Sequence, residues 1–407
     1  MEMINQGDTA WVLISSAMVM LMTPALGFFY GGMVRRKNVL STIMMCCSVV
    51  ALISIQWVLF GYSLAFGPDK GHLIGSLQWA GFNGVGQTPN ADYAATIPHQ
   101  VFASFQAMFA VITPALIVAA FVERIKFTGF MVLVLLWATV IYDPVAHWVW
   151  GVGGWLRQMG ALDFAGGTVV HITAGMSALA LAIYMGQRKG YGRQSFEPNN
   201  IPYVVLGAFL LWFGWFGFNA GSALGANGLA GNAFIVTNTA AAAAGLTWMI
   251  LSSIWGKPSV LGFSTGAVVG LVAITPACGY VGVIPAIIIG AVAASISYAG
   301  ILIRNRSAID ESLDAFACHG LGGITGALLT GVFASKLVNP AGADGLLHGN
   351  PHQLLIQAVA VLVVAVYSFG LTFILAAVTD KVFGLRVEEH EEEVGLDLSQ
   401  HAEKAFA

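Results

Sequence analysis

Two histidines stand well inside long apolar segments of the sequence, where they could act on a small polar molecule. His171 and His319 each follow an acidic residue by eight positions, Asp163 in the first case and Glu311 in the second. A neutral imidazole ring offers one hydrogen-bond donor and one acceptor. A lone histidine on an apolar face is most often a satisfied core residue, but a symmetric pair of ionisable groups at lipid depth tends to mark a pathway. We therefore interpret the pair as lining a pore.

Several aromatic residues and one hydroxyl are expected at one end of this pathway. Phe105 and Phe109 are spaced i, i+4 and share one helix face. Phe218 and Ser222 close another apolar segment, and Trp150 follows a third. Any one of these residues could belong to the aromatic belt of a membrane protein. Together they predict a cation–π site for a small cation, followed by an apolar constriction.

Charged groups are scarce in the chain as a whole. Only 9% of the 407 residues are charged, the net charge is −3, and no basic patch is present, which argues against a nucleic-acid partner. Without a charged cluster in the expected pore, an anion or a strongly hydrated metal ion would find no compensation for its lost water. The four cysteines, Cys46, Cys47, Cys278 and Cys318, lack the spacing of a metal or haem site. We expect no metal, no cofactor and no enzymatic activity.

Transmembrane helices are predicted to carry these residues. Hydrophobic residues make up 57% of the chain, and its 49 glycines lie largely within apolar segments, as in packed transmembrane helices. At about 20 apolar residues per crossing, the sequence predicts eleven spans in an all-α integral membrane protein. Their approximate ranges are 9–31, 39–66, 99–121, 128–147, 164–186, 202–222, 233–253, 260–276, 283–303, 313–334 and 353–382.

The basic residues predict the orientation. All but three of the 17 Lys and Arg residues fall after spans one, three, five, seven and nine or after the last span, the exceptions being Lys70, Arg157 and Lys336. Loops rich in Lys and Arg stay in the cytoplasm. The N-terminus is therefore expected outside and the C-terminus inside, in a multi-pass protein of the cytoplasmic membrane.

Spans one to five and six to ten are predicted to form two repeats, over about 9–186 and 202–334, with the last helix outside them. GFFYGG at 27–32 is echoed by GWFGFNAG at 214–221. Five spans per half make the second repeat inverted, which places a transporter's site at the repeat interface. Asp163 and Glu311 then open their spans from opposite faces, and eight residues put each histidine roughly 12 Å deep. In a core of about 30 Å the two rings differ in depth by roughly 6 Å, so we expect them to meet near the midplane.

A predicted cytoplasmic tail at 384–407 follows the membrane domain at 1–383. It carries five glutamates between Glu388 and Glu393. The simplest interpretation is a solvated acidic end. Because the tail lies on the face with most of the basic residues, it could instead fold back onto loops such as 188–193 or 304–306 and be displaced by a partner.

The motifs together resemble the ammonium transporter family of Amt, Mep and Rh proteins. The likeness runs from GFFYGGMVRRKN at 27–38 to the tail, and its most specific parts are DFAGGTVVH at 163–171 and WFGFNAGS at 215–222. The presence of Trp150 resembles the microbial Amt branch, whereas Glu311 stands where the family has Asp. The resemblance implies an external cation site at Trp150, Phe105, Phe109 and Ser222, a gate at Phe109 and Phe218, pore histidines at His171 and His319, and a mouth acid at Asp163.

The resemblance also implies partners. It implies a homotrimer with one pore per subunit, embedded in the lipid membrane. It further implies a tail that is read by PII-type nitrogen-regulatory proteins, here through Gly384, Arg386, Gly395 and Asp397.

Ammonium uptake is the expected function. Ammonium and potassium are close in size, so cavity size alone cannot separate them, but only ammonium can lose a proton and cross a dry gate as a neutral molecule. The resemblance favours net charge transfer with each ammonia. Two alternatives stay open at this point: a receptor that senses ammonium without moving it, and an electron-transfer subunit with His171 and His319 as axial haem ligands.

Overall fold

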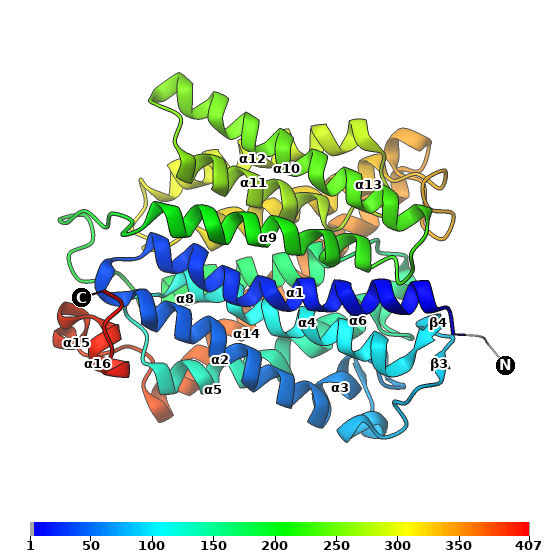
Figure 1. The fold of residues 1–407 in the computed structure, drawn as a ribbon, viewed down its shortest axis with the longest axis horizontal. Helices are drawn as coiled ribbons and strands as arrows, with labels where there is room; N and C mark the ends of the chain where they lie inside the picture. Colours follow the sequence, from blue (N-terminus) through cyan, green and yellow to red (C-terminus); the bar gives the residue numbers. More distant parts are fainter. Residues whose placement is uncertain (1–3, 407) are drawn as a thin grey trace.

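Long helices laid side by side make up most of the molecule (Figure 1). The computed structural model describes residues 4–406, without the side chain of Trp255; residues 1–3 of the predicted membrane domain and residue 407 of the predicted tail lie outside the described residues. The α-helices are α1 (Gln6–Met33), α2 (Val39–Gln56), α3 (Tyr62–Phe66), α4 (His99–Ile117), α5 (Phe127–Trp137), α6 (Asp143–Trp150), α7 (Trp155–Met159), α8 (Thr173–Met185), α9 (Ile201–Gly221), α10 (Gly228–Trp255), α11 (Val260–Ile274), α12 (Val283–Arg304), α13 (Gly322–Phe333), α14 (Pro351–Phe383), α15 (Glu389–Val394) and α16 (Leu396–His401).

Short irregular helices and strands join them. Four single-turn π-helices are continuous with longer helices: η2 (Trp57–Gly61), η5 (Ala138–Tyr142), η6 (Gly167–Ile172) and η7 (Phe316–Leu321). The 3₁₀ turns are η1 (Arg36–Asn38), η3 (Leu77–Phe82), η4 (Val118–Ala120) and η8 (Leu346–His348). Two antiparallel hairpins pair β1 (Asp69–Lys70) with β2 (Ile74–Gly75) and β3 (Pro89–Asn90) with β4 (Ala94–Pro98).

Ten helices within residues 4–406 are long and apolar enough to cross a membrane. A helix lies at each of the eleven predicted spans, and the fold is nearly all-helical, with two short hairpins between the helices. The helix at the predicted span 260–276 is the exception in length, because α11 has only 15 residues, fewer than the roughly 20 that a full crossing takes. The count of eleven crossings therefore stays a prediction.

The predicted boundary of the fourth span was wrong. The sequence places its end near residue 147 and Trp150 just after it, but the helix runs on through η5 and α6 to Trp150 itself. Pro144 lies at the start of α6. In a regular α-helix its ring would clash with the carbonyl four residues earlier, and it has no N–H to donate. The wider π turn at η5 precedes this proline and lets the helix continue.

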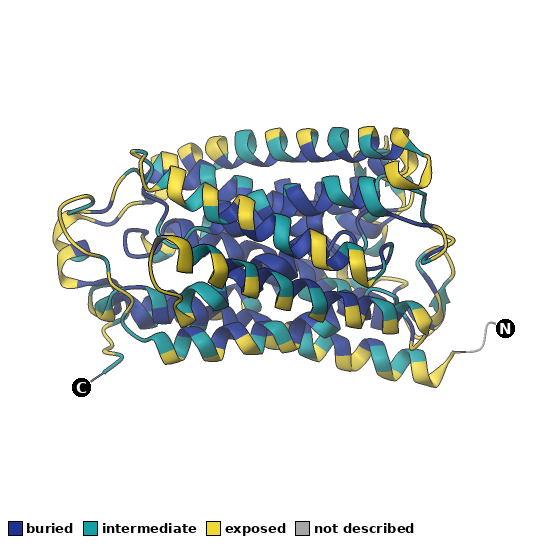
Figure 2. Ribbon diagram, turned by 90° about the horizontal axis from the view of Figure 1, so that it is seen from above, coloured by how far each residue is buried: buried dark blue, intermediate teal, exposed yellow. Residues whose placement is uncertain are grey.

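Glycines let α1 and α9 pack closely along their length (Figure 1). A Cβ on Gly207 would collide with the main chain of Phe29, and a Cβ on Gly214 would collide with Met22. Small residues at such contacts are typical of membrane helices. The buried residues lie in the middle of the helix assembly, while exposed residues follow its outer faces and both ends (Figure 2).

A buried ionic network joins four connecting segments. Arg188 pairs with Glu123 at 2.9 Å and with Asp310 at 2.8 Å, and Arg35 pairs with Glu123 at 3.1 Å. Burial alone would raise the pKa of Glu123, but the two arginines hold it below its ordinary value. The guanidinium groups of Arg188 and Arg35 both lie over the Phe196 ring, at 4.1 and 4.6 Å from its centre. The network fixes the loops at one end of the assembly relative to one another.

Candidate functional site

Three cavities follow one another through the helix assembly. The mouth cavity, of about 560 Å³, is lined by Phe109, Trp150 and other residues, and the tail-side cavity, of about 340 Å³, by residues that include Phe29. The central cavity holds only about 10 Å³ and is lined by both Phe218 and Phe29. Phe109 and Phe218 touch, with ring centres 4.4 Å apart. The mouth cavity therefore meets the central cavity at this ring pair, and Phe29 borders both the central and the tail-side cavity.

The mouth cavity brings together most of the predicted cation site. Trp150, Phe109 and Ser222 all line it, and the Trp150 and Phe109 rings stand edge to face with centres 5.9 Å apart. The Ser222 hydroxyl donates to the carbonyl of Phe218 at 2.8 Å, which leaves its oxygen lone pairs free to accept from a ligand. Phe105 differs from the prediction: it is fully buried behind Phe109, at 4.9 Å between ring centres, and is not among the residues that line the cavity. It supports the Phe109 ring.

Sequence reasoning missed other residues of the mouth cavity. Tyr93, Gln106, Asp92 and Arg157 also line it, and Arg157 donates from Nη1 to the carbonyl of Trp150 at 2.5 Å. Asp92 lies in a loop and Arg157 in the five-residue helix α7, and neither segment is long enough to show a periodic pattern that predicts which way a side chain points. The mouth thus carries charged groups that the sequence analysis did not expect.

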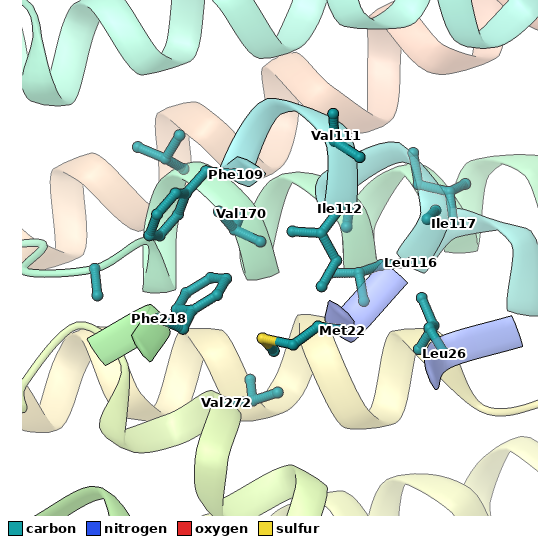
Figure 3. Close-up of a cluster of buried hydrophobic side chains, with 14 of the residues drawn as sticks. Met22, Leu26, Phe109, Val111, Ile112, Leu116, Ile117, Val170, Phe218 and Val272 are labelled. Atoms are coloured by element: carbon teal, nitrogen blue, oxygen red, sulfur yellow. The ribbon is translucent and has the colours of Figure 1, made fainter. Parts of the chain in front are cut away.

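The passage beyond the phenyl pair is apolar. Figure 3 shows Phe109 and Phe218 facing each other, with Met22, Ile112 and Leu116 farther along. Those three side chains line the central cavity together with Phe218. A cavity of this size takes about one water molecule. An ion would have to leave nearly all of its hydration shell to enter.

The two histidines meet inside the central cavity. The rings of His171 and His319 stack with centres 5.3 Å apart and planes 20° apart, and both line the cavity. Neither ring nitrogen of His171, nor Nδ1 of His319, has a hydrogen-bond partner among the described residues. Trp215 stacks on His171 at 5.5 Å between ring centres. The unpartnered nitrogens leave donors and acceptors available to a small polar molecule.

The arrangement of the two rings does not fit a haem site. Axial ligands direct one nitrogen each at a shared iron from opposite faces of the macrocycle. The His171 and His319 rings instead stack directly on each other, with planes 20° apart and centres 5.3 Å apart. Within residues 4–406, no group of three His, Cys, Asp or Glu side chains gathers as a metal site. The haem alternative is set aside on the ring geometry.

Asp163 holds the helix that carries His171. Its two carboxylate oxygens accept four main-chain N–H groups, from Gly166, Gly167, Thr168 and Val169, at 2.6–3.0 Å. These are the otherwise unpaired donors at the start of the π turn. The Asp163 carbonyl also accepts from Trp150 Nε1 at 2.9 Å. Burial raises the pKa of the Asp163 carboxyl, and the four amide donors act in the opposite direction.

Glu311 occupies the matching position before His319, with fewer bonds. Its Oε1 accepts from Phe316 N at 2.6 Å, at the start of the π turn that holds His319. Burial, with a smaller contribution from Asp314, raises the pKa of Glu311 to about 8. Both histidines therefore lie on a π turn whose start is bound by the acid upstream, through four N–H groups at Asp163 and one at Glu311.

The tail packs against the membrane domain instead of extending into solvent. Asp397 is buried, and its Oδ1 accepts from Ser41 N at 2.8 Å in the first turn of α2. A carboxylate is favourable there because the helix N-terminus is partly positive. Leu396 N donates to Asn38 Oδ1 at 2.8 Å. Gly395 has a positive φ of 106°, and a Cβ at this position would collide with Lys37.

A second anchor of the tail is Glu392. Its carboxylate accepts from Lys189 N at 2.5 Å and pairs with Arg386 at 3.1 Å, and Arg386 also donates to Met185 O at 2.7 Å. Gly384, with a φ of 73°, ends α14 and turns the chain toward these contacts. Of the two loops expected to receive the tail, 188–193 does so through Lys189, whereas Arg304 of the other is paired with Asp314.

The match to known proteins runs along nearly the whole chain. Residues 10–406 match the family model described as Ammonium Transporter Family. The chain belongs to this family. The family expected from the motifs is thereby confirmed, and with it a multi-pass membrane protein.

Individual members of the ammonium transporter family are similar over their full length. The transporter is 50% identical to the "Ammonium transporter" of Bacillus subtilis (strain 168), with 99% of each chain covered. It is 49% identical to "Ammonium transporter Amt1" of Archaeoglobus fulgidus, covering 99% of this chain and 100% of that one. The crystal structure of Saccharomyces cerevisiae Mep2 superposes with a TM-score of 0.90 at 34% identity, covering 98% of this chain and 90% of that one.

Proposed function

We propose that the transporter captures ammonium at Trp150, removes its proton, and passes ammonia between Phe109 and Phe218 to the paired histidines. The order of groups along one line supports this most. A wide aromatic cavity comes first, then two touching phenyl rings, then a cavity of about 10 Å³ lined by stacked imidazoles. Capture, desolvation and passage of a neutral molecule each have a matching environment.

Capture relies on π faces and a hydroxyl. The Trp150 and Phe109 rings attract a cation through their quadrupoles, and Ser222 accepts a hydrogen bond from it. Deeper entry strips water from the ion. Loss of water favours the uncharged form of an amine, as burial does for lysine, so bound ammonium gives up its proton to water in the mouth cavity more readily than in solution.

The apolar passage selects by chemistry. Ammonia crosses the phenyl pair without charge, whereas potassium has no neutral form and pays the full desolvation cost. His171 and His319 then offer donors and acceptors that replace water for ammonia. The proton released at the mouth follows by the same histidine pair, so each ammonia moves with net charge.

The remaining predictions concern topology and assembly. We propose eleven crossings of the cytoplasmic membrane in two inverted repeats plus α14, with the N-terminus and the mouth cavity outside. The contact of α1 with α9 and the matched π turns of His171 and His319 support the repeat. We also propose a homotrimer with one pore per subunit, which native mass in detergent tests.

Uptake of isotopically labelled ammonium tests transport itself. Liposomes containing the full chain are expected to accumulate label faster than empty liposomes. Equal uptake by both would leave a receptor that binds ammonium without moving it.

Replacing Trp150 with leucine should weaken capture. The substitution keeps much of the apolar packing but removes the indole quadrupole, so half-saturation by ammonium is expected to rise roughly two- to thirtyfold, equivalent to about 0.5–2 kcal/mol. Trp212→Leu is the matched control, because Trp212 stacks on Phe209 away from the three cavities. Unchanged half-saturation in Trp150→Leu would reduce Trp150 to an interface anchor.

We further propose that the tail is a regulatory element read by a PII-type protein. The tail is held by exposed ion pairs, such as Lys189 with Glu389 at 3.0 Å, and by the bonds of two buried carboxylates, Asp397 and Glu392. A partner of ordinary affinity can displace a segment held in this way.

Removal of the tail after Phe383 is expected to keep the pore working and to abolish partner control. Asp397→Ala should act in the same direction by freeing the first turn of α2. Glu403→Gln, at an exposed residue of the same tail, serves as the control. Pull-down of PII-type proteins and transport are measured together. Equal binding and equal regulation with and without the tail would leave it a solvated acidic end.

A further inference from the structure

Two glutamines on α14 bind the main chain just before Asp163. Gln357 accepts from Leu162 N at 2.7 Å through Oε1 and donates to Leu162 O at 2.8 Å through Nε2. The same Nε2 donates to Ala327 O at 3.1 Å on α13. Gln353, one turn earlier, donates to Gly160 O at 2.9 Å. Through these two side chains, α14 is hydrogen-bonded to the main chain of residues 160–162.

The orientation of the Gln357 amide is fixed. The residue is 1% exposed, and a buried primary amide is costly unless its donors and acceptors are all used. Both hydrogens of Nε2 have acceptors, on Leu162 and Ala327. Its Oε1 accepts from Leu162 N and, at 3.3 Å, from Gln353 Nε2. Loss of the amide would leave the main-chain groups of Leu162 without partners.

Leu162 directly precedes the residue that contacts both the Trp150 ring and the π turn of His171. The next residue, Asp163, binds four N–H groups of the π turn that holds His171. The Asp163 carbonyl accepts from the indole of Trp150. A shift of the main chain at Leu162 therefore moves the anchor of the Trp150 ring and the start of the His171 helix together.

The helix α14 does not touch the pathway itself. The described residues that line the mouth, central and tail-side cavities include none from Pro351–Phe383. Any influence of Gln357 on the pathway must pass through the segment that it binds. We infer that Gln357 is a positioning residue, which sets the Asp163 segment and through it the Trp150 cation site. The effect on ammonium rests on the proposed function, whereas the effect on the segment does not.

Gln357→Met tests this in the full-length protein in lipid nanodiscs. Methionine is of similar length and cannot replace the three main-chain bonds or the bond from Gln353. Hydrogen exchange of residues 162–169 is expected to become faster, and half-saturation by ammonium to rise roughly two- to tenfold, the size of about one net hydrogen bond, with a smaller change in maximal current. Thr372→Val is the matched control, because it removes a buried polar contact of α14 with Ser177 far along the helix.

Two results would overturn the inference, and they are distinguishable. Unchanged exchange at residues 162–169 in Gln357→Met would show that the glutamine does not hold the segment. Faster exchange with unchanged half-saturation would show that the segment does not set cation binding, which also counts against the Trp150 site. If Gln357→Met does not fold, Gln353→Met removes the Gly160 contact and should speed exchange of residues 160–162 to a smaller degree.

Discussion

Potassium currents are expected to appear when either pore histidine is replaced by alanine. The central cavity is now about 10 Å³, and removal of an imidazole ring enlarges it beyond the roughly 10–15 Å³ that one water molecule needs. A continuous file of water lets an intact cation keep part of its hydration shell. His171→Ala and His319→Ala should therefore lose the discrimination between ammonium and potassium while the protein stays folded.

The measurement compares currents from ammonium and potassium in liposomes containing each variant. His352→Ala is the control, because His352 is exposed at the start of α14. Thermal unfolding in detergent shows whether each variant keeps its fold. Selectivity equal to that of the unmodified protein in both variants would remove the histidines from the mechanism.

Asp163→Ala is expected to abolish transport and to lower stability strongly. Four main-chain N–H groups would lose their acceptor in a buried place, and hydrogen bonds to a charged group contribute about 1.5–3 kcal/mol each. Because losses within one network are not additive, we expect a total on the order of 4 kcal/mol. Such a loss should appear as a large fall in the unfolding temperature.

A second substitution separates the contribution of the Asp163 charge from that of its hydrogen-bond acceptors. Asp163→Asn keeps one carbonyl oxygen as an acceptor and loses the charge, so it should unfold between the alanine variant and the unmodified protein. Asp92→Ala removes an exposed acid of the same cavity and should change the unfolding temperature little. If Asp163→Ala unfolded at the temperature of the unmodified protein, its role as the anchor of the His171 helix would be wrong.

Hydropathy predicted the helices well because membrane spans are continuous apolar segments. It failed at two places for physical reasons. The helix α11 is short, and the pattern extended past Ile274 because the following turn is also apolar. The fourth span continued to Trp150 because a π turn accommodates Pro144, a change of hydrogen bonding that leaves no mark in composition.

The pairing of the two histidines could be predicted from symmetry, whereas the residues that hold the site in place could not. Equal spacing from an acid to His171 and His319 predicted that the rings meet, and the structure brings them to 5.3 Å. Trp150, Phe109 and Ser222 were expected together because each was predicted near the same end of its span, and all three line the mouth cavity. Gln357 binds the main chain of Leu162, which is distant in sequence, and Arg157 binds the carbonyl of Trp150. Neither contact has a local sequence signal. The burial of Phe105 behind Phe109, away from the mouth cavity, was also beyond a spacing rule, which gives the helix face but not the depth of the ring.

Deprotonation before passage is tested most directly by recording charge movement and nitrogen uptake in the same liposomes. Unmodified protein is given ammonium and then potassium at equal concentration and equal voltage. Ammonium should produce uptake accompanied by current, because ammonia and its proton both cross, and potassium should produce no current, because it has no neutral form to pass between Phe109 and Phe218. A potassium current comparable with the ammonium current would mean that intact cations cross, and would contradict deprotonation at the mouth.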